Sequence, residues 1–152
     1  MTIEIATEIE FNATPESVWK VLTDFENYPK WNPFIKSISG EKKEGKRLAI
    51  EITQPNRKPM TFSPVVLTFK TNKELRWLGK LGVKGIFDGE HYFRIIEREN
   101  GYIKFEHGEI FSGILVGFMP KLLKDTKIGF ERMNKALKEE CENETYDRQR
   151  NL

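Results

Sequence analysis

The stretch TPESVWKVLTDFENYPKWNPF, residues 14–34, decides how the rest of this chain is interpreted. Thr14 can cap a helix and Pro15 suits the first helical position, so the pair predicts that a helix begins here. The apolar residues that follow, from Val18 to Leu22, recur at helical spacing. This first helix is short, because it ends before Tyr28-Pro29.

The second half of the same stretch predicts another short helical segment and then a sharp change of direction. The helical segment covers Phe25 to Lys30, and Trp31-Asn32-Pro33-Phe34 follows it. Pro33 cannot continue a helix, and it restricts Asn32 to an extended conformation. We therefore expect two short helices that lead into a sheet.

Upstream of this stretch, the residues from Thr2 to Phe11 are typical of a half-buried strand. Apolar side chains alternate with acidic ones. The apolar face carries Ile3, Ile5, Ile9 and Phe11, and the opposite face carries Glu4, Glu8 and Glu10. A period of two is that of a strand with one buried face and one solvated face.

Downstream of the stretch, the pattern predicts six further strands separated by turns. They are expected over residues 35–39, 47–53, 61–71, 75–79, 85–98 and 102–111. Glu99-Asn100-Gly101 is typical of a tight turn, so the last two strands should be neighbours. Hairpin spacing along this run indicates an antiparallel sheet.

The chain closes with a long amphipathic helix, predicted from about Gly117 to Glu142. Its regular part should begin near Pro120, because proline is tolerated in the first turn and not deeper. Gly129 in the middle predicts close packing or a bend. The polar residues beyond 142 are expected to fray. The apolar stripe of the helix consists of Phe118, Leu122, Phe130, Met133 and Leu137.

Together these elements predict one α+β domain over residues 1–144 and a polar tail over residues 145–152. The apolar stripe of the helix and the apolar face of the sheet need each other. The long helix is therefore expected to lie across the concave face of a curved, seven-stranded antiparallel sheet. A strongly curved sheet that holds one helix leaves a gap between the two, and apolar ligands bind in gaps of that kind.

Composition is that of a soluble globular protein. The 152 residues, 38% hydrophobic and 32% charged, suffice for one domain with its own core. The net charge of +2 lacks the strong basic bias of a dedicated nucleic-acid binder, so no nucleic-acid partner is expected. No run of about 18 apolar residues could span a membrane, and the first residues do not form a signal peptide. We expect a monomer or a weak homodimer.

The single cysteine, Cys141, excludes an internal disulfide and predicts a reducing, cytoplasmic setting. Acidic residues surround it, at Glu139, Glu140 and Glu142. Neighbouring acids disfavour the thiolate, so Cys141 is not expected to be a catalytic nucleophile.

Four segments carry a resemblance to a known superfamily. They are Ile9 to Trp19, Trp31 to Phe34, Gly89 to Phe93 and Phe105 to Gly113. In these segments and in its layout from Thr2 to Leu137 the chain resembles the START-like or SRPBCC superfamily, and above all its small single-domain bacterial members. The superfamily includes polyketide cyclases and dehydrases, lipid-transfer domains, birch-pollen allergens and the activator of a heat-shock chaperone ATPase. The resemblance implies the helix-grip fold. It implies no particular reaction, because the superfamily has no shared catalytic set.

Two neighbouring strands carry the candidate polar site, with the residues His91, Phe93, Phe105, His107, Glu109 and Phe111. If their faces point toward the long helix, two imidazoles and one carboxyl group converge in an apolar space. They could anchor the polar end of a ligand, or His107 and Glu109 could form an acid/base pair. They could also form a satisfied structural cluster, or lie on the outward face of the sheet. Two His and one Glu match the ligand set of non-haem iron. They lie on two strands without a compact motif, however, so we expect no metal and no cofactor.

Other candidate ligand contacts are aromatic or aliphatic: Trp31, Phe34, Trp77, Phe118 and Leu122. Trp31, Phe34 and Trp77 could line the mouth of a cavity, and the last two could form its roof on the long helix. Each has a purely structural alternative, a hydrophobic plug at the turn or part of the core stripe.

The sequence therefore predicts a binding domain for a small hydrophobic molecule, such as a lipid, a polyketide or an aromatic metabolite. A cyclase/dehydratase-like or hydrolase-like enzyme that uses His107 and Glu109 is the alternative. A third possibility is a protein-partner domain like the chaperone activator, which would show a large apolar patch on the outer sheet face. The outward Glu residues of the first strand disfavour that patch.

Overall fold

The computed structural model describes residues 1–80 and 83–150, with side chains to residue 145. Eight strands, three α-helices and three short 3₁₀ segments follow one another in these residues. Their order is β1 (Thr2–Asn12), α1 (Pro15–Thr23), η1 (Phe25–Asn27), α2 (Tyr28–Trp31), β2 (Ile35–Gly40), β3 (Leu48–Ile52), β4 (Met60–Phe62), β5 (Val65–Lys70), β6 (Glu74–Lys80), β7 (Asp88–Glu97), η2 (Glu99–Gly101), β8 (Tyr102–Ser112), η3 (Val116–Phe118) and α3 (Pro120–Arg150).

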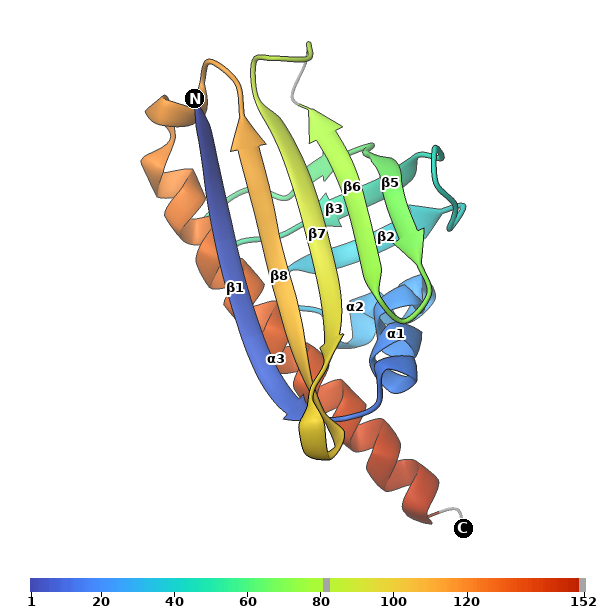
Figure 1. Ribbon diagram of the computed structural model, residues 1–152. Coiled ribbons are helices and arrows are strands. Elements are labelled where there is room, and N and C mark those ends of the chain that lie inside the picture. The colour runs from blue at the N-terminus through green and yellow to red at the C-terminus, as the bar shows by residue number, and fades with distance from the viewer. Residues whose placement is uncertain (81–82, 151–152) are drawn as a thin grey trace.

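The strands form two antiparallel sheets, and α3 crosses behind the larger one (Figure 1). The five-stranded sheet has the order β1-β8-β7-β6-β5, and the three-stranded sheet has the order β2-β3-β4. An isolated bridge between Arg47 and Val65 links the two sheets. The helix-grip arrangement is confirmed.

The strand count corrects the prediction, because eight strands replace the expected seven. The segment expected to be one strand over residues 61–71 is divided at Ser63-Pro64 into β4 and β5. Pro64 has no N–H to donate to a ladder, and its carbonyl accepts the backbone N–H of Leu48 at 2.9 Å. The chain therefore leaves the small sheet there and enters the large one.

The first short helix forms as predicted, and the helical segment expected from Phe25 to Lys30 consists of η1 followed by α2. The Thr14 side chain caps α1 by accepting the backbone N–H of Ser17 at 3.1 Å. The apolar face of α1 from Val18 to Leu22 is buried. After α2, the Asn32 side-chain oxygen accepts the backbone N–H groups of Phe34 and Ile35, at 2.9 and 2.8 Å. These bonds hold the turn that sends the chain into β2.

The long helix begins at Pro120, which confirms the start predicted for its regular part. The expectation of close packing at Gly129 is confirmed, because a Cβ atom there would lie 2.6 Å from the ring of Phe34. The helix continues to Arg150, so the residues expected to fray beyond 142 are helical as far as 150. Residues 151–152 of the predicted tail lie outside the described residues. The Lys138–Glu142 pair, one turn apart at 3.6 Å, supports the helix where fraying was expected.

In the described part of the chain, the outer face of the large sheet carries charged and polar side chains. Arg94 lies between Glu74 and Glu106, at 4.0 and 3.3 Å. Tyr92 crosses Gly108 on this face, and its hydroxyl donates to Glu4 at 2.7 Å. No helix in the described part of the chain has the length and apolarity to cross a membrane.

Candidate functional site

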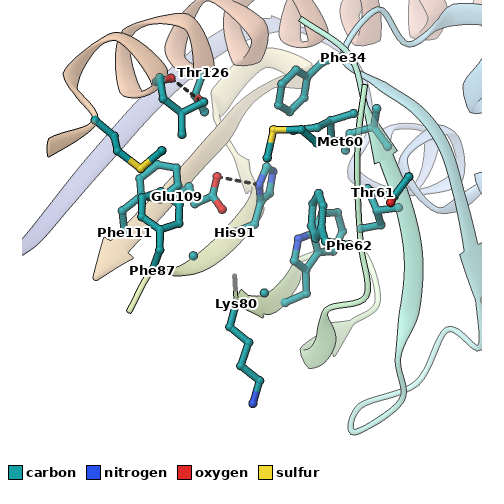
Figure 2. A pocket seen from close by; sticks show the side chains of 18 residues that line it. Phe34, Met60, Thr61, Phe62, Lys80, Phe87, His91, Glu109, Phe111 and Thr126 are labelled. Carbon is teal, nitrogen blue, oxygen red and sulfur yellow. Dashed lines mark hydrogen bonds and ion pairs between the residues drawn. The ribbon is translucent and has the colours of Figure 1, made fainter. Parts of the chain in front are cut away.

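A cavity of about 140 Å³ lies between the large sheet, the small sheet and α3 (Figure 2). Its walls are mostly apolar, and its most exposed lining residues, Met60, Thr61 and Lys80, mark the side that meets solvent. The lining residues are Phe34, Ile35, Ile50, Ile52, Met60, Thr61, Phe62, Trp77, Gly79, Lys80, Phe87, Gly89, His91, Glu109, Phe111, Met119, Leu122 and Thr126.

Six of the residues proposed from the sequence line this cavity. They come from the turn after α2, from three strands of the large sheet and from α3: Phe34, Trp77, His91, Glu109, Phe111 and Leu122. Strand register explains the central group. His91 lies directly opposite Glu109 across the β7–β8 ladder and opposite Trp77 across the β6–β7 ladder.

The other five proposed residues do not line the cavity. Phe93 and Phe105 share its face of the sheet but lie further along the strands, fully buried in the core. His107 is also fully buried, one step behind His91. Trp31 packs edge-on against Tyr28, with ring centroids 5.3 Å apart. Phe118 lies before α3 begins, in η3, and is 81% exposed, so it forms no roof.

The sequence interpretation missed one whole wall of the cavity. Ile50 and Ile52 on β3 and Met60 and Phe62 on β4 close the side opposite the large sheet. Leu48, Ile50 and Ile52 alternate along the strand expected over residues 47–53, and this spacing is typical of one apolar face. This face lies across the cavity from the large sheet because the chain changes sheets at Ser63-Pro64. Alternation in the sequence does not reveal that change.

Two glycines in register make room for the polar group. Gly79 and Gly89 lie opposite each other on β6 and β7, and both line the cavity. A Cβ atom on Gly89 would collide with Oε1 of Glu109, because the Glu109 carboxyl group lies across this glycine. The absence of a side chain at position 89 therefore lets Glu109 extend along the cavity wall.

Glu109 begins a line of polar groups that runs from the cavity into the core. Its Oε2 lies 3.5 Å from Nδ1 of His91, the contact drawn in Figure 2. The Nε2 of His91 lies 2.8 Å from the Nε2 of His107. The His91 ring also stacks on Trp77, with centroids 4.9 Å apart. The predicted acid/base pair of His107 and Glu109 is thus not a direct pair, because His91 lies between them.

The line continues to α3 and β1 through two residues that sequence analysis did not single out. Nδ1 of His107 lies 2.9 Å from Oδ1 of Asn134, and Nδ2 of Asn134 donates to Oγ1 of Thr7 at 2.8 Å. Oγ1 of Thr7 donates to the backbone carbonyl of His107 at 2.6 Å. Both residues interrupt an apolar face in the sequence: Thr7 lies between Ile5 and Ile9, and Asn134 lies four residues after Phe130. That interruption was the available signal.

The hydroxyl of Thr7 determines the direction of every proton in this line. Its one hydrogen goes to the carbonyl of His107, so its oxygen must accept from the amide nitrogen of Asn134. The amide oxygen then faces His107, whose Nδ1 must carry a hydrogen. In a neutral His107, Nε2 accepts, and His91 must donate from its own Nε2. A neutral His91 is left with a lone pair on Nδ1, facing Glu109.

Burial favours the neutral form of each titratable group in the line. Loss of hydration lowers the pKa of His91 from 6.5 to about 3. The pKa of His107 is lowered well below its usual value, first by burial and then by the nearby His91. Burial raises the pKa of Glu109 from 4.5 to about 8. At neutral pH the site therefore contains a protonated carboxyl group beside two uncharged imidazoles.

Metal binding has little support in this geometry. The two Nε2 atoms of His91 and His107 are hydrogen-bonded to each other, so they do not point at a common ion. Among the residues that the structure describes, no group of three or more His, Cys, Asp or Glu side chains is arranged to hold a metal. What the site offers is an apolar cavity, one carboxyl group and a protonation state determined by hydrogen bonds.

A family model described as "Polyketide cyclase / dehydrase and lipid transport" matches residues 2–142. The chain belongs to this family. The match includes every strand of the cavity wall and the part of α3 that covers it. A search of curated proteins found no match for this member of the polyketide cyclase/dehydrase and lipid transport family.

Solved structures share the fold of this polyketide cyclase/dehydrase and lipid transport family member over nearly its whole length. A START superfamily protein from Mycobacterium smegmatis is 20% identical and has a TM-score of 0.73, covering 92% of this chain and 97% of its own. The Zhui aromatase/cyclase from Streptomyces is 12% identical at a TM-score of 0.76, covering 95% and 96%. Norcoclaurine synthase from Thalictrum flavum is 12% identical at a TM-score of 0.69, covering 91% and 92%. At these identities the likeness concerns the fold alone.

Proposed function

We propose that this protein binds a small hydrophobic molecule in the cavity between the two sheets and α3. The observation that carries the proposal is an apolar cavity that contains a single carboxyl group, that of Glu109. A pocket of this kind binds by removing apolar ligand surface from water, while one polar group orients the ligand. The family and the shared fold point to the same class of ligand.

The size of the cavity favours an aromatic metabolite over a lipid or a polycyclic polyketide. A volume of about 140 Å³ is close to the roughly 150 Å³ that accommodates one benzene-sized ring. A longer chain or several fused rings would require α3 to move away from the small sheet. Two contacts oppose that movement. Arg57 pairs with Asp125 at 2.9 Å, and Gln54 donates to Thr126 at 3.3 Å.

Binding in this cavity is tested by titration with toluene and with a fluorescent apolar probe, combined with native mass spectrometry of the purified protein. Leu122→Trp places a larger ring in the cavity from α3 and should abolish binding. The matched control is Ile128→Trp, on the same helix at a position that is 39% exposed and does not line the cavity. Equal binding by the two variants, or no binding by the unmodified protein, would contradict the proposal.

A cyclase- or dehydratase-like reaction is the second candidate function, now with Glu109 and His91 in place of Glu109 and His107. The favouring observation is that Glu109 reaches the cavity as a protonated acid beside the lone pair of His91 Nδ1. A general acid must hold its proton near neutral pH, and Glu109 does. Unchanged turnover of an identified substrate by Glu109→Gln and by His91→Phe would exclude this reaction.

A further inference from the structure

We propose that the ligand of this cavity is a small aromatic amine, and that the carboxylate of Glu109 is its counter-ion. The inference deepens the proposed function and rests on it. It follows from three features of the described residues: which atoms in the site can exchange a proton, where the positive charges lie, and what the walls are made of.

The first feature concerns the hydrogen-bonded line that runs from Glu109 through the two histidines to Asn134 and Thr7. Within this line, Glu109 is the group that can exchange a proton with a ligand. The Nε2–H of His91 is used by His107, and the Nδ1 of His91 faces Glu109 rather than open space. His107 is fully buried and bonded on both ring nitrogens. The contact of 3.5 Å between Glu109 and His91 is longer than a good hydrogen bond. The carboxyl group is therefore weakly held and free to engage a ligand atom.

The second feature is the distribution of charge around the cavity. Among the described lining residues, Lys80 is the one positive group, and Figure 2 shows its side chain pointing away from the others. The arginines of β6 and β7, Arg76 and Arg94, lie on the opposite face of the sheet, beside Tyr92. A carboxylate ligand would lose its hydration and meet no cation inside. An ammonium ligand would meet Glu109.

The third feature is the aromatic wall. Trp77, Phe62, Phe87 and Phe111 all line the cavity, and the last two rings pack against each other with centroids 5.4 Å apart. Aromatic faces attract cations and also pack against another ring. A ligand with one ring and one ammonium group fits both the volume and the wall.

Binding would release one proton. In solution at pH 7 the amine is an ammonium ion, and it keeps its proton on entry. Glu109 enters the complex as a carboxylate, so its own proton passes to solvent: an ammonium ion plus a carboxylic acid gives an ammonium–carboxylate pair plus one hydrogen ion. No bond other than the O–H bond of Glu109 is broken.

The test compares benzylamine, benzyl alcohol and benzoate, which share one ring and differ in charge. At pH 7 benzylamine should bind about tenfold more tightly than benzyl alcohol, since the desolvated ion pair adds to the ring contact, and benzoate should bind least. Calorimetry in buffers of different ionisation enthalpy should show the release of nearly one proton with benzylamine and none with benzyl alcohol. Glu109→Gln should reduce benzylamine to the affinity of benzyl alcohol.

The matched control is Glu106→Gln, which removes a carboxylate from the same strand on the opposite face. It should leave the preference for benzylamine unchanged. Binding of all three compounds with equal affinity, or benzylamine binding without proton release, would overturn the inference while the proposed function stands. Failure of both benzyl alcohol and benzylamine to bind would overturn the proposed function itself. The proton count is measured on the unmodified protein, so the test holds even if the variant does not fold.

Discussion

Glu109 and Glu106 lie three residues apart on β8, on opposite faces of the same sheet, and their side chains have different kinds of neighbour. Glu106 lies on the outer face, 3.3 Å from Arg94 and 3.6 Å from Lys104, among ions in contact with water. Glu109 lies on the inner face, where burial raises its pKa to about 8 and its neighbour is an uncharged imidazole. Access to water decides which face carries ion pairs and which carries a line of neutral hydrogen bonds.

The two faces also differ in how much stability is lost when one polar side chain is removed. Ion pairs on the outer face can be replaced by water, so each contributes little to stability. His91, His107 and Asn134 are buried, so a group removed from the line between Glu109 and Thr7 leaves another polar group buried and unsatisfied. The following changes should separate the two faces, from the largest expected effect to the smallest.

Asn134→Leu should have the largest effect, because it interrupts the inner line at its middle. It removes the acceptor of the His107 Nδ1–H group and the donor that faces Thr7 Oγ1, and a buried polar group left unsatisfied costs about 1–3 kcal/mol. We expect a loss of about 2–4 kcal/mol in the free energy of unfolding, measured by urea denaturation. The control is Asn143→Leu, at an exposed position of the same helix. Equal stability of the two variants would show that the line does not support the fold.

The pH dependence of stability should show the shifted pKa values of Glu109 and the two histidines. Between pH 4.5 and 8 the folded protein holds a proton on Glu109 that the unfolded chain has lost, so stability falls as pH rises. Between pH 3 and 6.5 the unfolded chain protonates His91 and the folded protein does not, so stability rises with pH. His107 acts in the same direction as His91. These three groups together predict a maximum near pH 6.5.

The contribution of Glu109 can be isolated with Glu109→Gln. From pH 6.5 to 8 the unmodified protein should lose about 1.6 kcal/mol relative to this variant, since the slope is about 1.4 kcal/mol per pH unit for one proton and falls to half at the pKa of about 8. Urea denaturation at a series of pH values provides the measurement. The same slope in both proteins above pH 6.5 would mean that Glu109 is already ionised there.

Gly89→Ala should have an intermediate effect. The added methyl group would collide with Oε1 of Glu109 and push the carboxyl group along the cavity, away from His91. Since the far end of a flexible side chain can yield, we expect a loss of about 1–2 kcal/mol in stability and weaker ligand binding. Gly79→Ala, on the facing strand, is the control, because its Cβ would meet the Phe62 ring at 3.4 Å. A larger loss at position 79 than at position 89 would contradict the assigned role of Gly89.

Glu106→Gln on the outer face should have the smallest effect, a loss of about 0.2–1 kcal/mol that disappears at high salt. Thermal unfolding at low and high ionic strength measures it. A salt-insensitive loss as large as that of Asn134→Leu would remove the distinction between the two faces.

The candidate site could be predicted in part because strand alternation is a local property. Placing His91 and Glu109 on one face needed only the period of two and the turn at Glu99-Asn100-Gly101. The polar residues Thr7 and Asn134 stand out in their apolar faces for the same reason. Their connection to His107 could not be predicted, because it joins residues 100 and 27 positions apart in the chain. Such contacts depend on how the sheet curves and where the helix lies.

The sequence by itself determined most of the elements and their order, because caps, prolines and periodicity act over a few residues. The helix-grip fold was implied by the resemblance, and the division of residues 61–71 into β4 and β5 was not predicted. The long helix and both short ones follow from such local signals. Only the tertiary structure decided which inward-facing residues reach open space. Phe93 and Phe105 have the same pattern as His91 and Glu109, yet they are fully buried in the core. The difference follows the length of α3: Phe130 and Met133 pack into the core with these rings, whereas Leu122 and Thr126, nearer the start of the helix, line the cavity.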